Sequence, residues 1–155
     1  MRWDSTITTN KGDTIYVTNI TCTINLENNT FVNNDSTGNF LRLQKDSWGN
    51  WGSNGGEVTL VMTNQKVSGN IVTDSISTLE MTMKSSSTFE GIINGDNTAK
   101  EIKLTLDKTS KIKLTGNSYV TILDNADSNN SNIDFNSYKL YVNGKVSIKS
   151  FRNIL

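Results

Sequence analysis

Three stretches of the chain decide its fold: Val58-Thr59-Leu60-Val61-Met62, Leu79-Glu80-Met81-Thr82-Met83 and Ile102-Lys103-Leu104-Thr105-Leu106. In each stretch large apolar side chains occupy every second position, as in a strand that buries one face. The central residues Leu60, Met81 and Leu104 follow one another at similar intervals along the chain. Strands that recur in this way are typical of a solenoid, in which each coil of chain stacks on the previous one.

The N-terminal half of the chain repeats at a shorter interval. Seventeen positions separate successive members of two series, which are Ile7, Ile24, Leu41 and Val58, and Leu26, Leu43 and Leu60. We predict that each series forms one stacked column, and that the coils after Val58 grow through longer corner loops. The last step would then be the longest, from Leu104 to Phe135.

Several coils contain a second short strand that is followed by a glycine. These strands lie at Val67, at Phe89 and at Ile112 with Leu114, and the glycines are Gly69, Gly91 and Gly116. Glycine suits a corner, where the backbone needs positive φ or approaches another segment closely. The pattern predicts an all-β, right-handed parallel β-helix. A β-sandwich is the alternative, because it also uses short alternating strands at regular spacing.

The C-terminal region carries a hairpin pattern. Tyr138–Val142 and Lys145–Ile148 flank Asn143-Gly144, a dipeptide that favours a type I′ turn. We expect this hairpin to cap the end of the coil stack, with Phe151, Ile154 and Leu155 completing the cover. Residues 1–155 are expected to form a single solenoid domain that belongs to a longer surface protein.

The composition excludes several classes of function. Asn, Ser and Thr make up 59 of the 155 residues, which disfavours helices because these side chains compete with helical hydrogen bonds.

Histidine is absent, so a Ser-His-Asp triad and a His-containing zinc site are excluded. The formal net charge is zero, so we expect no nucleic-acid partner, and no apolar run is long enough for membrane insertion as a helix. Cys22 is the single cysteine and is expected to act as a small buried apolar residue.

From Gly56 onward the chain resembles a bacterial surface β-helix family, the clostridial carbohydrate-binding domains with a pectate-lyase-like fold. The resemblance rests on Asn64 to Ile71 with Asp74 to Leu79, on Leu104 to Asp107, on Leu114-Thr115-Gly116-Asn117-Ser118-Tyr119-Val120-Thr121 and on Asn132 to Gly144. A related element occurs in autotransporter passenger β-helices. The resemblance implies a bacterial, secreted or cell-surface module that binds carbohydrate or acts as an adhesin.

The stretch Asp46 to Gly56 is the strongest candidate binding site in the sequence. It holds Trp48 and Trp51 among glycines, asparagines and one carboxylate. Indole faces stack on sugar rings, and polar neighbours orient the sugar hydroxyls. The predicted glycan-binding residues are Trp51, Trp48, Asp46, Asn50, Asn54 and Arg42. Trp48 follows Phe31 at the same seventeen-position interval, so a place in a core column is the favoured alternative for it.

The segment 123–130 is a second, weaker candidate. Asp124 and Asp127 offer oxygen ligands that calcium accepts, and a turn that caps its own backbone is the alternative. An enzyme would have to rely on carboxylates, lysines or an arginine, and Asp74, Glu80 and Glu90 are candidates to share a face. Arg42 lies between Leu41 and Leu43 and is expected to point outward.

We therefore expect a non-catalytic extracellular or cell-surface module whose partner is a polysaccharide or surface glycan. One alternative is a structural spacer or stalk without a ligand of its own. Another is a calcium-dependent polysaccharide lyase. Ice binding would need Thr-x-Thr repeats in every coil, and the repeats at Thr6-Ile7-Thr8 and Thr21-Cys22-Thr23 are not continued. Self-association through the open solenoid ends is a further expectation, because such ends expose unpaired strand edges.

Overall fold

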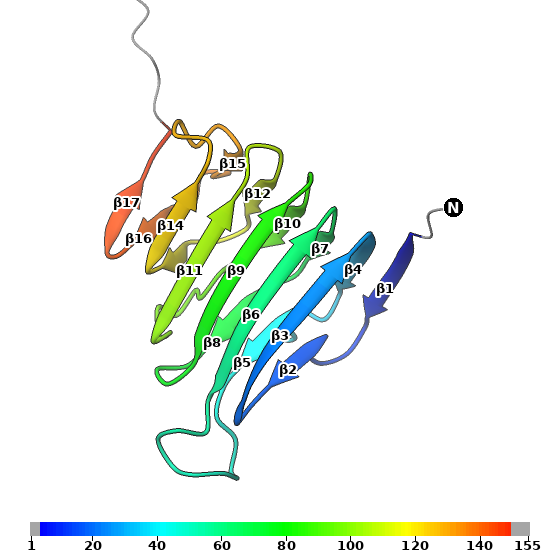
Figure 1. Ribbon diagram of the computed structural model, residues 1–155, viewed down its shortest axis with the longest axis vertical. Helices are drawn as coiled ribbons and strands as arrows, with labels where there is room; N and C mark the ends of the chain where they lie inside the picture. The colour runs from blue at the N-terminus through cyan, green and yellow to red at the C-terminus, as the bar shows by residue number, and fades with distance from the viewer. Residues whose placement is uncertain (1–3, 150–155) are drawn as a thin grey trace, which may run out of the picture.

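The computed structural model describes residues 4–149, which form a parallel β-solenoid of about six coils (Figure 1). The coils have three sides, and each side is a sheet in which a strand pairs with the equivalent strand of the next coil. All pairings between coils are parallel, so the β-helix prediction is confirmed and the β-sandwich is wrong. Within residues 4–149 no helix is long and apolar enough to cross a membrane.

Each side contains one strand from most coils. The first side has the order β1 (Ser5–Thr9), β4 (Asn29–Asn33), β7 (Lys66–Ser68), β10 (Thr88–Gly91), β12 (Lys111–Leu114) and β15 (Ile133–Asp134). The second side contains β2 (Ile15–Val17), β5 (Leu41–Leu43) and β8 (Ile71–Thr73), and continues through a bridge at Ile93 to β13 (Ser118–Val120), β16 (Leu140–Val142) and β17 (Lys145–Ser147). The third side has the order β3 (Ile20–Glu27), β6 (Gly56–Thr63), β9 (Thr78–Lys84), β11 (Glu101–Leu106) and β14 (Ile122–Asn125).

The core is built from columns of inward-facing residues. On the third side Leu60 stacks on Met81 and Met81 on Leu104, and all three are fully buried. On the first side the equivalent column is Phe31, Val67, Phe89, Ile112 and Ile133. The strict alternation of buried and less buried positions in β6 and β9 is what the sequence pattern predicted, because successive strand residues point to opposite faces.

The prediction of columns at the seventeen-position interval is wrong. Ile7 pairs with Phe31, Ile24 with Leu60, Leu41 with Ile71, and Val58 with Leu79. The interval steps from one side of the solenoid to another, because a full coil of three sides needs a longer stretch of chain. The prediction that the next coil extends from Leu104 to Phe135 is also wrong. Leu104 pairs with Leu123, so Phe135 is not its stacked partner.

Glycine allows neighbouring coils to approach closely at one corner of the first side. Gly69 has a φ of 150° and Gly91 follows it one coil later, and a Cβ atom on Gly91 would overlap the carbonyl oxygen of Gly69. This close approach explains why both of these positions carry glycine, as the sequence predicted.

The two ends of the stack differ. β16 and β17 form the predicted antiparallel hairpin, and Asn143 and Gly144 have φ values of 48° and 80°, as a type I′ turn requires. Phe151, Ile154 and Leu155 lie outside the described residues. At the first coil Ile7 and Ile20 are 44% and 56% exposed, and Cys22 is half-buried against the core instead of fully buried. Self-association at this end remains a prediction.

Candidate functional site

The corner loop, residues 44–55, joins β5 to β6 and projects beyond the stacked coils (Figure 1). It lengthens the coil that runs from β4 to the paired strand β7. Asn54 fixes its shape, because the Nδ2 group donates hydrogen bonds to the carbonyl oxygens of Asp46 at 2.9 Å and Trp48 at 2.8 Å. The predicted ligand residue Asn54 is buried, so it closes the loop and does not face solvent.

Both tryptophans of the loop face solvent. Trp51 is 82% exposed and Trp48 is 54% exposed. The prediction that Trp48 continues a column with Phe31 is wrong, because Phe31 stacks on Val67 within the first side while the loop lies outside that ladder. The Lys45 Nζ atom lies 4.5 Å from the centroid of a Trp51 ring, a cation–π contact that favours one orientation of the indole.

Arg42 lies beside the corner loop on the second side. It points outward between the buried residues Leu41 and Leu43, as predicted. Its guanidinium carbon lies 4.4 Å from the ring centroid of Tyr16, the residue with which it pairs across β2 and β5. Its Nη1 atom is 3.5 Å from Asp13 Oδ2, and its Nε donates to Gln44 Oε1 at 2.8 Å. These contacts on several sides hold the guanidinium in place.

Tyr16 joins this cluster to the corner loop. Its hydroxyl donates a hydrogen bond to Asp46 Oδ2 at 3.0 Å. The main cause that raises the pKa of Tyr16 above its usual value is burial of the hydroxyl, and the next is its hydrogen bond to Asp46. Hydrogen bonds lower the pKa of Asp46, and the largest effect comes from the backbone N–H of Ser47 and the next from the Tyr16 hydroxyl. At neutral pH the pair is therefore a neutral phenol donating to a carboxylate.

A polar pocket of about 270 Å³ opens beside Arg42. Its walls include Asp13, Arg42, Gln44, Val72, Asp96 and Thr98. Carboxylates, an amide and a guanidinium around a small hollow can orient hydroxyl groups by hydrogen bonding. The structure thus brings Arg42 and Asp46 into one cluster with Tyr16, and it places the loop tryptophans on the segment that follows. Asn50 is exposed on that segment, and its carbonyl oxygen accepts the Ser53 N–H at 3.0 Å.

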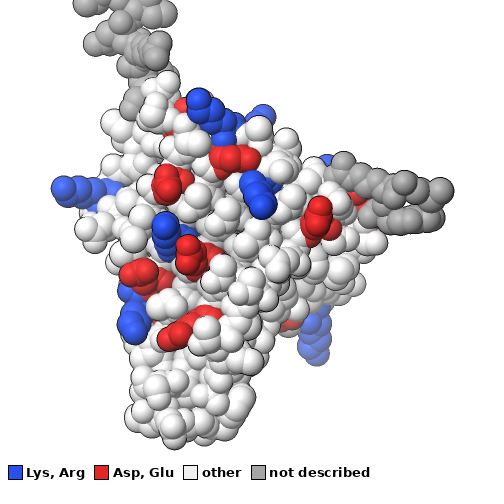
Figure 2. Space-filling model, in the orientation of Figure 1, with Lys and Arg blue, Asp and Glu red and all other residues white. Residues whose placement is uncertain are grey.

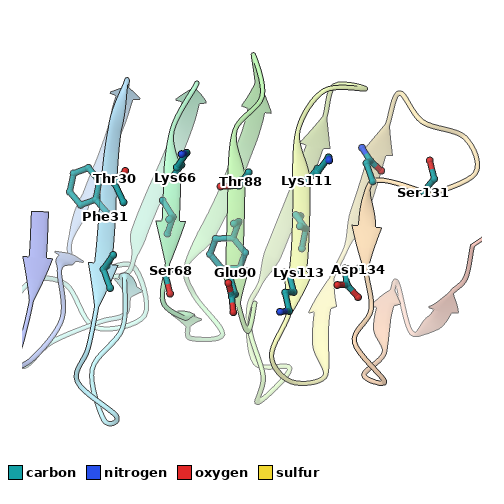
Figure 3. A pocket seen from close by; sticks show the side chains of 15 residues that line it. Thr30, Phe31, Lys66, Ser68, Thr88, Glu90, Lys111, Lys113, Ser131 and Asp134 are labelled. Carbon is teal, nitrogen blue, oxygen red and sulfur yellow. The ribbon is translucent and has the colours of Figure 1, made fainter. Parts of the chain in front are cut away.

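A second hollow, which we call the sheet groove, runs along the outer face of the first side. It crosses the strands from β4 to β15 and has a volume of about 450 Å³. Its lining comes from the first side and the turn leading into β15. The outward-facing residues of these strands form its walls, and the core lies beneath it. Figure 3 shows two rows of side chains along it: Thr30, Lys66, Thr88 and Lys111 in one row, and Ser68, Glu90, Lys113 and Asp134 in the other.

The sequence reasoning did not find the sheet groove. Its walls are the residues on either side of Val67, Phe89 and Ile112, which face outward where those three face inward. The signal was therefore present in the alternation of these short strands. Without the register between strands, however, the outward residues of different coils could not be aligned into rows.

The acidic candidates are distributed over several segments of the solenoid. The Asp127 carboxylate accepts hydrogen bonds from the Asn129 N–H and the Ser131 hydroxyl. The bond from the Ser131 hydroxyl is the main reason that the pKa of Asp127 is lowered. This is the self-capping turn considered for segment 123–130. Residues 4–149 contain no group of three or more His, Cys, Asp and Glu side chains arranged for a metal ion. Glu80 in β9 and Glu90 in β10 lie on different sides, so the prediction that they share a face is wrong.

No family model, no curated protein and no solved structure matches this chain. The fold and the local geometry are therefore the basis for a functional argument.

Proposed function

We propose that this chain is a non-catalytic glycan-binding module of a secreted or cell-surface protein, with the corner loop as its contact surface. The observation that carries the proposal is the exposure of the Trp51 indole, at 82%, on a loop closed by a buried asparagine. Exposed tryptophan side chains are enriched at binding surfaces, because the indole combines a large apolar face with an N–H donor. Indole faces complement the C–H faces of sugar rings.

The surroundings of Trp51 favour a sugar over a purely apolar ligand. Arg42, Asp13 and Gln44 line a polar pocket on the neighbouring side, and the Asp46 carboxylate lies between that side and the loop. Acidic and basic side chains are interspersed over the face in Figure 2, without a large patch of one sign. A neutral, hydroxyl-rich polymer suits such a surface, since it needs hydrogen bonds and stacking more than charge.

Affinity electrophoresis in gels containing cellulose derivatives, xylan, galactomannan or polygalacturonate tests this proposal. We expect retention of the unmodified chain by a neutral polysaccharide, and a weakening of about tenfold for Trp51→Ala, which corresponds to roughly 1.4 kcal/mol. Tyr138→Ala is the matched control, because Tyr138 is an exposed aromatic residue near the opposite end of the solenoid.

Three outcomes would contradict the proposal in different ways. Equal retention of Trp51→Ala and the unmodified chain would move the site away from the corner loop. No retention on any polysaccharide would favour the structural spacer. Release of unsaturated, ultraviolet-absorbing products from polygalacturonate with added calcium would favour the lyase.

A further inference from the structure

The sheet groove carries a charge pattern that follows the coils. Each coil contributes one outward residue to either row, and the register aligns Lys66 with Thr88 and Thr88 with Lys111. In the other row Ser68 aligns with Glu90, Glu90 with Lys113 and Lys113 with Asp134. The coil of β7 thus presents one positive charge, that of β10 one negative charge, that of β12 two positive charges and that of β15 one negative charge.

The charged residues of the second row lie on neighbouring strands, with Lys113 aligned between Glu90 and Asp134. Within residues 4–149 no carboxylate oxygen lies within 4 Å of the ammonium group of Lys66, Lys111 or Lys113, and the ion pair of Arg42 with Asp13 lies on another side of the solenoid. Lys66, Lys111 and Lys113 project from the walls of the groove (Figure 3). Opposite charges on neighbouring strands attract one another, and side chains that are not held in a close ion pair can also turn towards a ligand.

The floor of the groove follows the strand ladder. It lies over the buried residues Val67, Phe89 and Ile112, whose backbones are paired in the ladder. Neighbouring strands in a sheet are about 4.8 Å apart, so positions two coils apart are separated by about 10 Å. An extended glycan chain advances by a distance close to one strand spacing per sugar, so a glycan running along the coil stack would place one sugar over each coil.

From this geometry we propose that the sheet groove binds a linear acidic glycan with an anionic group on every second sugar. The anionic sugars lie over the coils of β7 and β12, where Lys66, Lys111 and Lys113 are their partners. The intervening neutral sugars lie over the coils of β10 and β15, where Glu90 and Asp134 accept hydrogen bonds from hydroxyl groups. A polymer charged on every sugar places anions against Glu90 and Asp134, which selects against it. This site is separate from the corner loop and does not rest on the function proposed for that loop.

Isothermal titration calorimetry with glycan fragments of equal length tests the proposal. The probes are a hyaluronan octasaccharide, with a carboxylate on alternate sugars, a polygalacturonate octasaccharide, with a carboxylate on every sugar, and a neutral cello-oligosaccharide. We expect the hyaluronan fragment to bind most tightly of the three. The double variant Lys66→Gln with Lys111→Gln should weaken this binding about tenfold.

Two controls separate this site from general charge attraction and from the corner loop. Lys84→Gln with Lys103→Gln removes the same charge from the third side and should leave hyaluronan binding within about twofold of the unmodified chain. Trp51→Ala should likewise leave it unchanged. Glu90→Gln with Asp134→Asn should raise the affinity for the polygalacturonate fragment about threefold or more, because it removes the repulsion.

The proposal is overturned by any of four results. These are the absence of measurable hyaluronan binding, tighter binding of polygalacturonate than of hyaluronan to the unmodified chain, equal losses in the two lysine double variants, and a loss of hyaluronan binding in Trp51→Ala. The last result would assign the acidic glycan to the corner loop. Failure of the loop proposal is observed separately, with neutral polysaccharides.

Discussion

The corner loop and the sheet groove present side chains to solvent in opposite ways. In the groove most side chains occupy ladder positions, and a buried residue such as Phe89 anchors the strand beneath them. In the loop the chain leaves the ladder. The Asn54 side chain holds the loop closed through hydrogen bonds to the carbonyl oxygens of Asp46 and Trp48. The groove therefore supplies fixed spacing, which suits a repeating polymer, and the loop supplies exposed aromatic area. The two surfaces should respond differently to mutation.

The sharpest test of this difference compares two aromatic truncations. Phe89→Ala removes a side chain that is 1% exposed and should lower the free energy of unfolding by about 3–5 kcal/mol. Trp51→Ala removes one that is 82% exposed and should change it by less than about 0.5 kcal/mol. Urea unfolding monitored by circular dichroism measures both values. A comparable loss in Trp51→Ala would mean that the loop packs on the coils, and the distinction would fail.

A second comparison concerns the bonds that close the loop. Asn54→Ala removes two hydrogen bonds to loop carbonyl groups and should cost about 1–3 kcal/mol. It should also lower the tryptophan fluorescence anisotropy, since the loop is released. Asn50→Ala is the matched control, because Asn50 is exposed, and it should change stability by less than about 0.5 kcal/mol. Identical effects of the two variants would show that Asn54 does not hold the loop.

The smallest expected effect concerns a loop that a carboxylate ties to the neighbouring coil. The backbone N–H groups of Gly12 and Thr37 lower the pKa of Asp35 from 3.8 to about 2. Because the folded-state pKa is the lower one, the ionised carboxylate stabilises the fold above the unfolded value of 3.8. This stabilisation declines as the pH falls from about 4 towards 2.

Thermal unfolding at about pH 5 and about pH 2.5 measures the contribution of Asp35. Asp35→Asn should have a lower Tm than the unmodified chain at the higher pH, and the difference should shrink at the lower pH. A difference that stays constant between the two conditions would show that ionisation of Asp35 does not contribute. The Asp35 side chain bonds to the neighbouring coil, whereas the Asn54 side chain bonds within its own loop, so the effect of Asp35 reports on contact between coils.

Individual strands were easier to predict from the sequence than their partners. The alternation around Leu60, Met81 and Leu104 predicted the correct strands and the correct stacking of these three residues. The seventeen-position interval predicted the wrong partners, because hydrophobic spacing alone does not say on which side of a coil a strand lies. The same error placed Trp48 in a core column, although it lies on a loop outside the ladder.

The candidate site was predictable only in part. Two tryptophans among glycines and asparagines indicated an exposed loop, and Trp51 is indeed exposed. The burial of Asn54 was not predictable, because its carbonyl partners come within reach only when the loop closes. The contact between Tyr16 and Arg42 depends on the pairing of β2 with β5, which joins segments that are distant in the chain.

The local features of this protein follow from its amino-acid sequence alone. Period-two alternation specifies strands with one buried face, and Asn143-Gly144 specifies the turn of the C-terminal hairpin, because both depend on neighbouring residues. Which coil lies on which, and so which outward residues form the rows of the sheet groove, is fixed only in the folded molecule. That register is set by the length of each corner loop and by the fit of the core columns. Both are properties of segments that are distant in the chain and meet only when the coils stack.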